Sequence, residues 1–203
     1  MKKIDHELFG RYLIDVMGDR FDEKYTPKFL MGCTAPDRNP FTYMRGSVKC
    51  KMFKGHNFGN TRGVIRRSIK LLAGKSNWGG SEYYRMGKMI HYITDAFTFP
   101  HNEEFVGSIK RHVQYELKLH QYLVSQIGRK TLLDESIENK FGKECNLYEY
   151  FLQNHRQYIE AYEGFDTDIT YMKEVTINIM SKLLEYQDIR FYNNANYVLN
   201  NVV

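Results

Sequence analysis

The chain has few cysteines and no long apolar run, and both absences limit what it can be. Its three cysteines among 203 residues form no C-x-x-C pair, so nothing in them indicates a disulfide framework or an oxidising compartment. No stretch of about 18 apolar residues occurs, which excludes a membrane-spanning helix. The first six residues, MKKIDH, interrupt any apolar run with charges and do not form a signal peptide. The expected location is therefore the cytoplasm.

Several catalytic motifs are also absent. There is no H-E-x-x-H zinc-protease motif and no glycine-rich loop of either the G-x-x-x-x-G-K-[ST] or the G-x-G-x-x-G type. A G-x-S-x-G nucleophile turn is missing as well. The adjacent His-Asp pair of HD-type phosphohydrolases does not occur, since the nearest match, Asp5-His6, runs in the reverse order.

Apolar and aromatic residues are plentiful and recur at helical spacing. The chain is 42% hydrophobic and 15% aromatic, which indicates a folded globule rather than disorder. Strand signals are weak, because no sustained alternation and no Asn-Gly turn occur. We expect an all-α, single-domain multi-helix bundle over residues 1–203. The predicted helices cover residues 5–18, about 60–72 capped by Asn60 or Thr61, 81–97, 108–127, 147–162 capped by Asn146, and about 166 onward with a break near 188–191.

Glycines and prolines predict an irregular loop between the first two of these helices. Residues 28–31 form a short apolar run that leads into Gly32, Pro36 and Pro40. Asp37 follows Pro36 directly, and Pro-Asp is first of all common turn chemistry. The net charge of +5 is mild, and the basic residues Arg62, Arg66, Arg67 and Lys70 favour a solvated helix face over a phosphate-binding patch.

Two pairs of metal-ligand side chains stand at helical spacing in the middle of the chain. His91 and Asp95 lie four residues apart in an apolar run, so one helix face presents both. His112 and Glu116 repeat that spacing in a second helix, for which Ser108 is the expected N-cap.

A fifth candidate ligand lies between the two helices. Pro100 ends the first of them, so His101 is expected on the connector just past its end. Taken singly, each of these five residues is more often a hydrogen-bonded core residue or a solvated pair. As a set they favour metal, because an unpaired Asp buried among aromatic rings costs several kcal/mol. Imidazole nitrogens and carboxylate oxygens suit Zn²⁺.

These residues carry a family resemblance. HYITDAFTFPH, from His91 to His101, resembles the H-x3-D-x5-H signature of the zinc-dependent phospholipase C family, which is related in fold to the S1/P1 nucleases, and His112 with Glu116 is similar to the pair that closes that pattern. Three earlier segments are similar to further parts of the family pattern: the helix that begins at Asp5-His6, GCTAPD with Asp37, and GHNF with His56. The resemblance covers roughly the first 120 residues in one consistent order.

The resemblance implies a zinc site and a reaction. His56, His91 and Asp95 would hold one zinc ion, and His101, His112 and Glu116 a second. Asp95 would bridge to a third ion held partly by His6. Asp37 would bind zinc weakly or act as the base for the attacking water.

The N-terminus departs from the family pattern. Secreted members bind the third ion through the amine and carbonyl of a first-residue Trp, whereas here only five residues precede His6. We expect Asp5 or water in that place. His120, one turn beyond Glu116, is expected to be a reserve ligand, a residue behind the ligands or a surface residue.

The expected function is hydrolysis of a glycerophospholipid head-group phosphodiester by metal-activated water. A nuclease or nucleotidase on the same zinc scaffold, and a non-enzymatic relative in which zinc is only structural, stay as alternatives. The expected partners are a phospholipid or another phosphodiester substrate and, through it, a peripheral membrane contact. No stable nucleic-acid partner is expected, and the oligomeric state is open.

Overall fold

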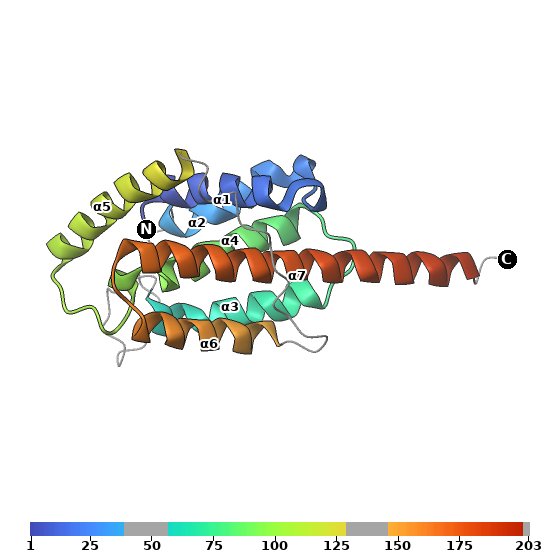
Figure 1. Cartoon of the computed structure of the whole chain (residues 1–203). Helices are drawn as coiled ribbons and strands as arrows, with labels where there is room; N and C mark the ends of the chain where they lie inside the picture. The colour runs from blue at the N-terminus through green and yellow to red at the C-terminus, as the bar shows by residue number, and fades with distance from the viewer. Residues whose placement is uncertain (39–56, 129–145, 201–203) are drawn as a thin grey trace.

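The protein is all-α, as its sequence predicts. The computed structural model describes residues 1–38, 57–128 and 146–200, and within these ranges it contains seven α-helices, three short 3-10 helices and no strand (Figure 1). None of these helices combines the length and the apolarity that a membrane span requires. The elements are α1 (Lys3–Met17), η1 (Gly18–Arg20), η2 (Glu23–Tyr25), α2 (Thr26–Arg38), α3 (Phe58–Ala73), α4 (Gly80–Ala96), η4 (Phe99–His101), α5 (Ile109–Gly128), α6 (Leu147–Glu160) and α7 (Phe165–Asn200).

Helix α4 is the central element of the bundle. It packs against α1, α2, α3 and α7, and in Figure 1 it lies between the α1/α2 layer and the α3/α6 layer. Its residues Met86, Met89 and Ile93 are fully buried, because apolar side chains recur on more than one face of this helix. α5, in contrast, lies at the outside, where it contacts α1 and α7.

Two glycines allow α2 and α4 to pack with their backbones in contact. A Cβ atom at Gly32 would lie 2.2 Å from the carbonyl oxygen of Tyr84, and one at Gly87 would lie 2.1 Å from the carbonyl oxygen of Phe29. Any larger residue at either position would force the two helices apart. This contact fixes the distance between α2, which carries Asp37, and α4, which carries His91 and Asp95.

Helix α2 corrects the predicted loop around Asp37. It runs from Thr26 to Arg38 and contains both Gly32 and Pro36. Proline removes one backbone hydrogen bond from a helix interior, but the packing of α2 against α4 holds the helix together, with Phe29 fully buried. Asp37 therefore lies in the last turn of a helix and not in a turn of irregular structure.

Other boundaries differ by smaller amounts. α3 begins at Phe58, and its N-cap is Asn57, whose Oδ1 accepts the backbone N–H of Asn60 at 2.9 Å; the predicted caps lie inside the helix. Asn146 caps α6 as predicted. α7 runs without a break through residues 188–191, so the predicted interruption there is wrong.

Candidate metal centre

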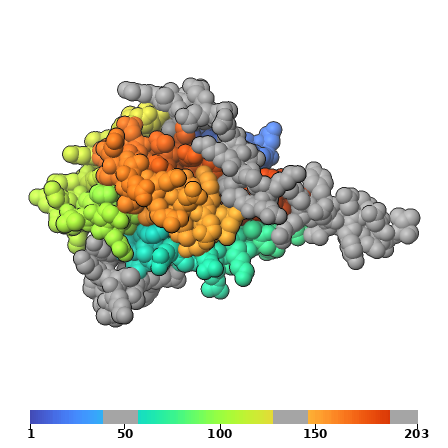
Figure 2. Space-filling view, turned by 60° about the horizontal axis from the view of Figure 1, so that its bottom comes forward, coloured from blue at the N-terminus to red at the C-terminus, as the bar shows by residue number. Residues whose placement is uncertain are grey.

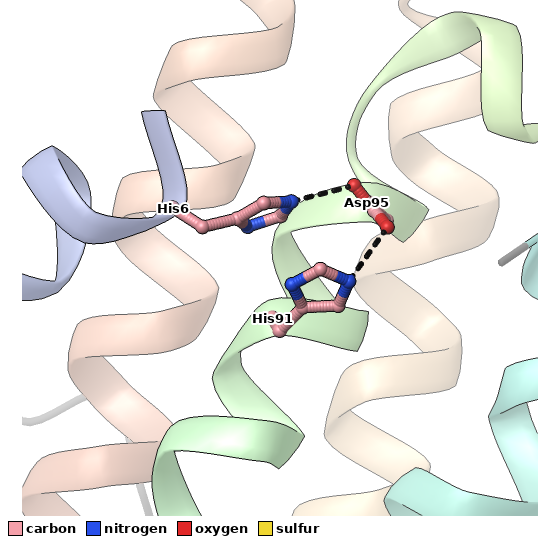
Figure 3. Close-up of side chains that lie close together, drawn as sticks. All are labelled: His6, His91 and Asp95. Atoms are coloured by element: carbon pink, nitrogen blue, oxygen red, sulfur yellow. Dashed lines mark ion pairs between the residues drawn. The ribbon is translucent and has the colours of Figure 1, made fainter. Parts of the chain in front are cut away.

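The first cluster of ligand side chains forms around α4. His91 and Asp95 lie one turn apart on this helix, and His91 Nε2 is 3.3 Å from Asp95 Oδ2. His6, from the opening turn of α1, reaches the same carboxylate, with Nε2 3.2 Å from Asp95 Oδ1 (Figure 3). The two imidazole rings stack at 3.8 Å. All three side chains are buried, so two elements distant in sequence bring three potential ligands together inside the core.

Hydrogen bonds behind the two imidazoles fix their tautomers. The Nδ1–H of His91 donates to the backbone carbonyl of Cys33 at 2.8 Å. The hydroxyl of Thr94 donates to the carbonyl of His91 at 2.8 Å, so at the 3.1 Å contact between Thr94 Oγ1 and His6 Nδ1 the imidazole is the donor. In a neutral ring, Nε2 then carries a lone pair. Both lone pairs converge on the Asp95 carboxylate.

This convergence fits a metal cation. Two nitrogen lone pairs and a carboxylate repel one another at 3.2–3.3 Å, unless positive charge lies among them. His6 Nε2 is buried and has no hydrogen-bond partner among the described residues, which is costly for a polar atom. Nitrogen and carboxylate donors with hydrogen-bonded partners behind them are what zinc sites in proteins use.

A second cluster adjoins the first. His112 Nε2 and His101 Nε2 lie 3.1 and 3.5 Å from Glu116 Oε1. His101 also lies 3.7 Å from Asp95 Oδ1, so Asp95 is within reach of both clusters. Pro100 lies in the 3-10 turn η4, which follows the end of α4 and positions His101. In each cluster the ligand atoms lie within 4.8 Å of one another.

The α-amino group of Met1 lies between the two clusters. Its nitrogen donates to Asp95 Oδ1 at 2.8 Å and lies 3.1 Å from both Glu116 Oε1 and His101 Nε2. Burial opposes its charge, but Asp95 and Glu116 outweigh burial and raise the pKa of this amine from 8.0 to about 11. The family pattern includes a first-residue amine as a ligand, but because only five residues precede His6, the sequence predicted Asp5 or water in its place.

Asp5 does not take this place. Its Oδ1 accepts a hydrogen bond from His120 Nδ1 at 2.5 Å, and the backbone N–H of Lys2 reaches its Oδ2 at 3.2 Å. His120 is therefore neither a reserve ligand nor a purely surface residue, since it fastens the first turn of α1, which carries His6, to α5.

Asp37 lies beside the first cluster. Its Oδ2 is 3.9 Å from His6 Nε2, and its Oδ1 is 3.7 Å from His91 Nε2. Unlike Asp95, its side chain remains 12% exposed, although its Oδ2 is buried. His56, the remaining predicted ligand, lies outside the described residues.

The protonation states favour metal binding. Burial lowers the pKa of His6 well below 6.5 and also lowers that of His101, so both imidazoles are neutral at pH 7. Burial alone would raise the pKa values of Asp95 and Glu116, but the neighbouring imidazoles, His101 first among them, and the Met1 amine together outweigh it, so both pKa values fall below those of free carboxyl groups. Neutral imidazoles and ionised carboxylates are the forms that bind metal ions.

A buried carboxylate behind the second cluster fixes its position. Asp168, at the start of α7, accepts hydrogen bonds from the hydroxyls of Tyr115 at 2.6 Å and Tyr158 at 2.7 Å, and from the backbone N–H of Phe99. Tyr115 precedes Glu116 in α5, and Phe99 opens the turn that carries His101. Burial raises the pKa of Asp168 to about 7, although these hydrogen bonds oppose the shift. Sequence spacing gave no sign of this residue, because its partners are ten or more residues away.

This geometry defines the class of the protein: it is an all-α bundle with two adjoining clusters of His and carboxylate side chains. The model of the family described as zinc dependent phospholipase C matches residues 5–165, which is more than half of the chain. The protein therefore belongs to the zinc-dependent phospholipase C family. No curated protein and no solved structure matches the chain.

Proposed function

We propose that this protein is a zinc-dependent phosphodiesterase that hydrolyses the head-group phosphodiester of a glycerophospholipid. Membership of the zinc-dependent phospholipase C family supports the reaction class. The observation that carries the proposal is the convergence of His6, His91 and Asp95 with the second cluster at one carboxylate, with Asp37 beside them.

Charge explains why such a site needs cations. With His6 and His101 neutral, the site contains three carboxylates, Asp37, Asp95 and Glu116, against the ammonium of Met1. This balance repels a phosphodiester anion. Bound zinc would supply positive charge for the phosphoryl oxygens and would lower the pKa of a water molecule. His6, His91 and Asp95 would hold one ion, and His101, His112 and Glu116 another.

Asp37 would then act as the base. Its carboxylate lies within 4 Å of both imidazoles of the first cluster, and its side chain is less buried than those of His6 and His91. A proton taken up at Oδ1 or Oδ2 would leave the attacking oxygen with its electron pair. Asp37→Asn keeps the shape of the side chain and removes the base, so turnover should fall by about 10²–10⁴.

The test compares Asp37→Asn with Asp15→Asn, an exposed residue of α1. Each zinc-loaded protein would be assayed for release of phosphocholine from a water-soluble short-chain phosphatidylcholine, with metal content measured by mass spectrometry. The wild type should carry at least two zinc ions per chain. Asp37→Asn should keep the metal and lose turnover, whereas Asp15→Asn should match the wild type.

Single-stranded DNA in the same assay distinguishes the alternatives. Cleavage of DNA but not of the phospholipid would replace the proposal by a nuclease function. Bound zinc without turnover of either substrate would leave zinc in a structural role. Turnover of the phospholipid at equal rates by wild type and Asp37→Asn would remove Asp37 from the mechanism.

A further inference from the structure

Exposed apolar side chains gather on and just before α5. Among the described residues, eight large hydrophobic side chains are exposed, and five of them lie in residues 106–124: Val106, Ile109, Val113, Leu117 and Val124. Val106 and Ile109 are 88% and 86% exposed. Scattered exposed apolar residues need no explanation, but a contiguous group marks an interaction site.

These residues form one band on the helix. Ile109, Val113, Leu117 and Val124 occupy an arc of about 80°, since each helical residue advances by about 100°. Glu116 lies about 20° outside that arc, on the side that faces the metal centre. His112, one turn earlier, is the most exposed ligand side chain, at 31%. The apolar band therefore borders the accessible edge of the second cluster.

Basic residues share the helix with the band: by the same 100° step Lys110 lies about 20° beyond Leu117, and Arg111 and Lys118 lie about 120° and 100° beyond it. Lys110, Arg111 and Lys118 are exposed, and none of them forms an ion pair with a carboxylate in the described ranges. Two acidic residues precede the band: Glu103, whose carboxylate lies beside Gly59 at the start of α3, and the exposed Glu104. An exposed apolar band with basic side chains on the same helix complements a surface of anionic lipids.

The first turn of α1 extends the same surface. The hydrogen bond between Asp5 and His120 holds this turn against α5, and next to Asp5 lie Ile4, which is 60% exposed, and the exposed Lys3. Figure 2 shows the segment around residues 100–115, in lime green, at one end of the molecule, where a flat surface could approach it.

We propose that this band, Val106, Ile109, Val113, Leu117 and Val124 with Lys110, Arg111 and Lys118, docks the protein on anionic phospholipid membranes. The bound surface would place the accessible edge of the metal centre, at His112 and Glu116, against the lipid head groups. This inference rests on the proposed phospholipid substrate, and it adds the surface through which that substrate is reached.

The test separates membrane binding from catalysis. Asp37→Asn provides a background that leaves the lipid intact, and sedimentation with vesicles of phosphatidylcholine and phosphatidylglycerol measures binding in it. The double variant Val106→Ser with Ile109→Ser should lower vesicle affinity at least about tenfold, because both apolar side chains lose their burial in the lipid. Leu71→Ser, at a residue of α3 that is 44% exposed, is the matched control and should bind like its background.

Charge provides a second, independent variant. Lys110→Glu with Arg111→Glu should also lose binding to the anionic vesicles, and added salt should weaken binding of the background protein. Arg67→Glu with Lys70→Glu, on the exposed face of α3, is the control with the same change in charge. Circular dichroism confirms that each variant is folded.

Turnover of the soluble short-chain substrate should be equal in the double serine variant and the wild type, whereas hydrolysis of vesicle lipid should fall with affinity. If the wild type does not hydrolyse the soluble substrate, this result would count against the proposed function and not against the docking surface. Unchanged vesicle binding in both α5 variants would overturn the docking proposal. So would a wild-type dimer that dissociates in the serine variant while vesicle binding is absent, because a second copy would then cover the band.

Discussion

Replacing Asp95 with asparagine tests whether one carboxylate holds the metal centre together. Asp95 is 1% exposed and lies 2.8 Å from the Met1 amine, 3.2 Å from His6 and 3.3 Å from His91. The change removes one negative charge and keeps the shape of the side chain. Because Asp95 faces both clusters, it should weaken metal binding at both.

The magnitude follows from linkage. A ligand present at about 100 times its dissociation constant stabilises the native state by about 2.7 kcal/mol per site. Two such sites contribute about 5 kcal/mol, which shifts the melting temperature of a chain of this size by roughly 10–20 °C. Chelation should lower the melting temperature of the wild type by that amount.

The metal-free forms should differ much less. Without metal, the asparagine variant loses the charge of the pair with the Met1 ammonium, which is costly for a buried pair. Its amide nitrogen, however, can donate to Nε2 of either His6 or His91, which face different oxygens of the carboxylate, where the carboxylate can donate to neither. These two effects oppose each other, so the chelated variant should melt within about 5 °C of the chelated wild type.

Thermal unfolding followed by circular dichroism, with and without chelator, measures both quantities. Chelation should change the melting temperature of Asp95→Asn by less than about 3 °C, and that of the exposed control Asp15→Asn as much as that of the wild type. An Asp95→Asn protein that binds zinc and responds to chelation like the wild type would refute the assignment of Asp95 as the shared ligand.

Two further predictions concern the packing around the centre. Gly87→Ala should destabilise the protein by at least about 2 kcal/mol in urea denaturation, because overpacking must separate α2 from α4; Gly63→Ala, in α3, where an added Cβ meets nothing within 4 Å, should be neutral or stabilising by up to about 1 kcal/mol. Equal stabilities of these two variants would contradict the close contact of the helices. The carboxyl of Asp168 has a pKa raised from 3.8 to about 7 in the folded state, so the folded protein binds this proton more tightly than the unfolded chain. The stability of the wild type relative to Asp168→Asn should therefore fall as pH rises, by about 3 kcal/mol between pH 4.5 and 7.5. A stability difference that is the same at both pH values would show that Asp168 does not titrate there.

The sequence predicted the two ligand pairs because their chemistry and their helical period coincide. His91 with Asp95, and His112 with Glu116, each stand four residues apart, and the structure places each pair on one helix, as expected. Pro100 correctly indicated that His101 would follow the end of α4. The all-α class followed from the same periodicity.

The features of the fold and the site that the sequence did not predict depend on contacts between segments distant in sequence. Gly32 and Pro36 predict a loop by local rules, but both lie in α2, because packing against α4 outweighs local propensity. The Met1 amine reaches Asp95 across 94 residues, and His91 is oriented by the carbonyl of Cys33. The carbonyl of Cys33 carries no sequence signature, whereas a first-residue amine is part of the family pattern and was set aside here because only five residues precede His6.

The glycine contact between α2 and α4 has a consequence for how substrate preference can vary in this scaffold. The backbones of α2 and α4 are in contact at Gly32 and Gly87. Substitutions elsewhere in the protein therefore should not change the distance between Asp37 and His91. Selectivity for one head group over another must then depend on the residues along the path by which the substrate reaches the metal centre. We expect Phe105 to be one of them, because its ring is partly exposed and lies 6.3 Å from that of His112.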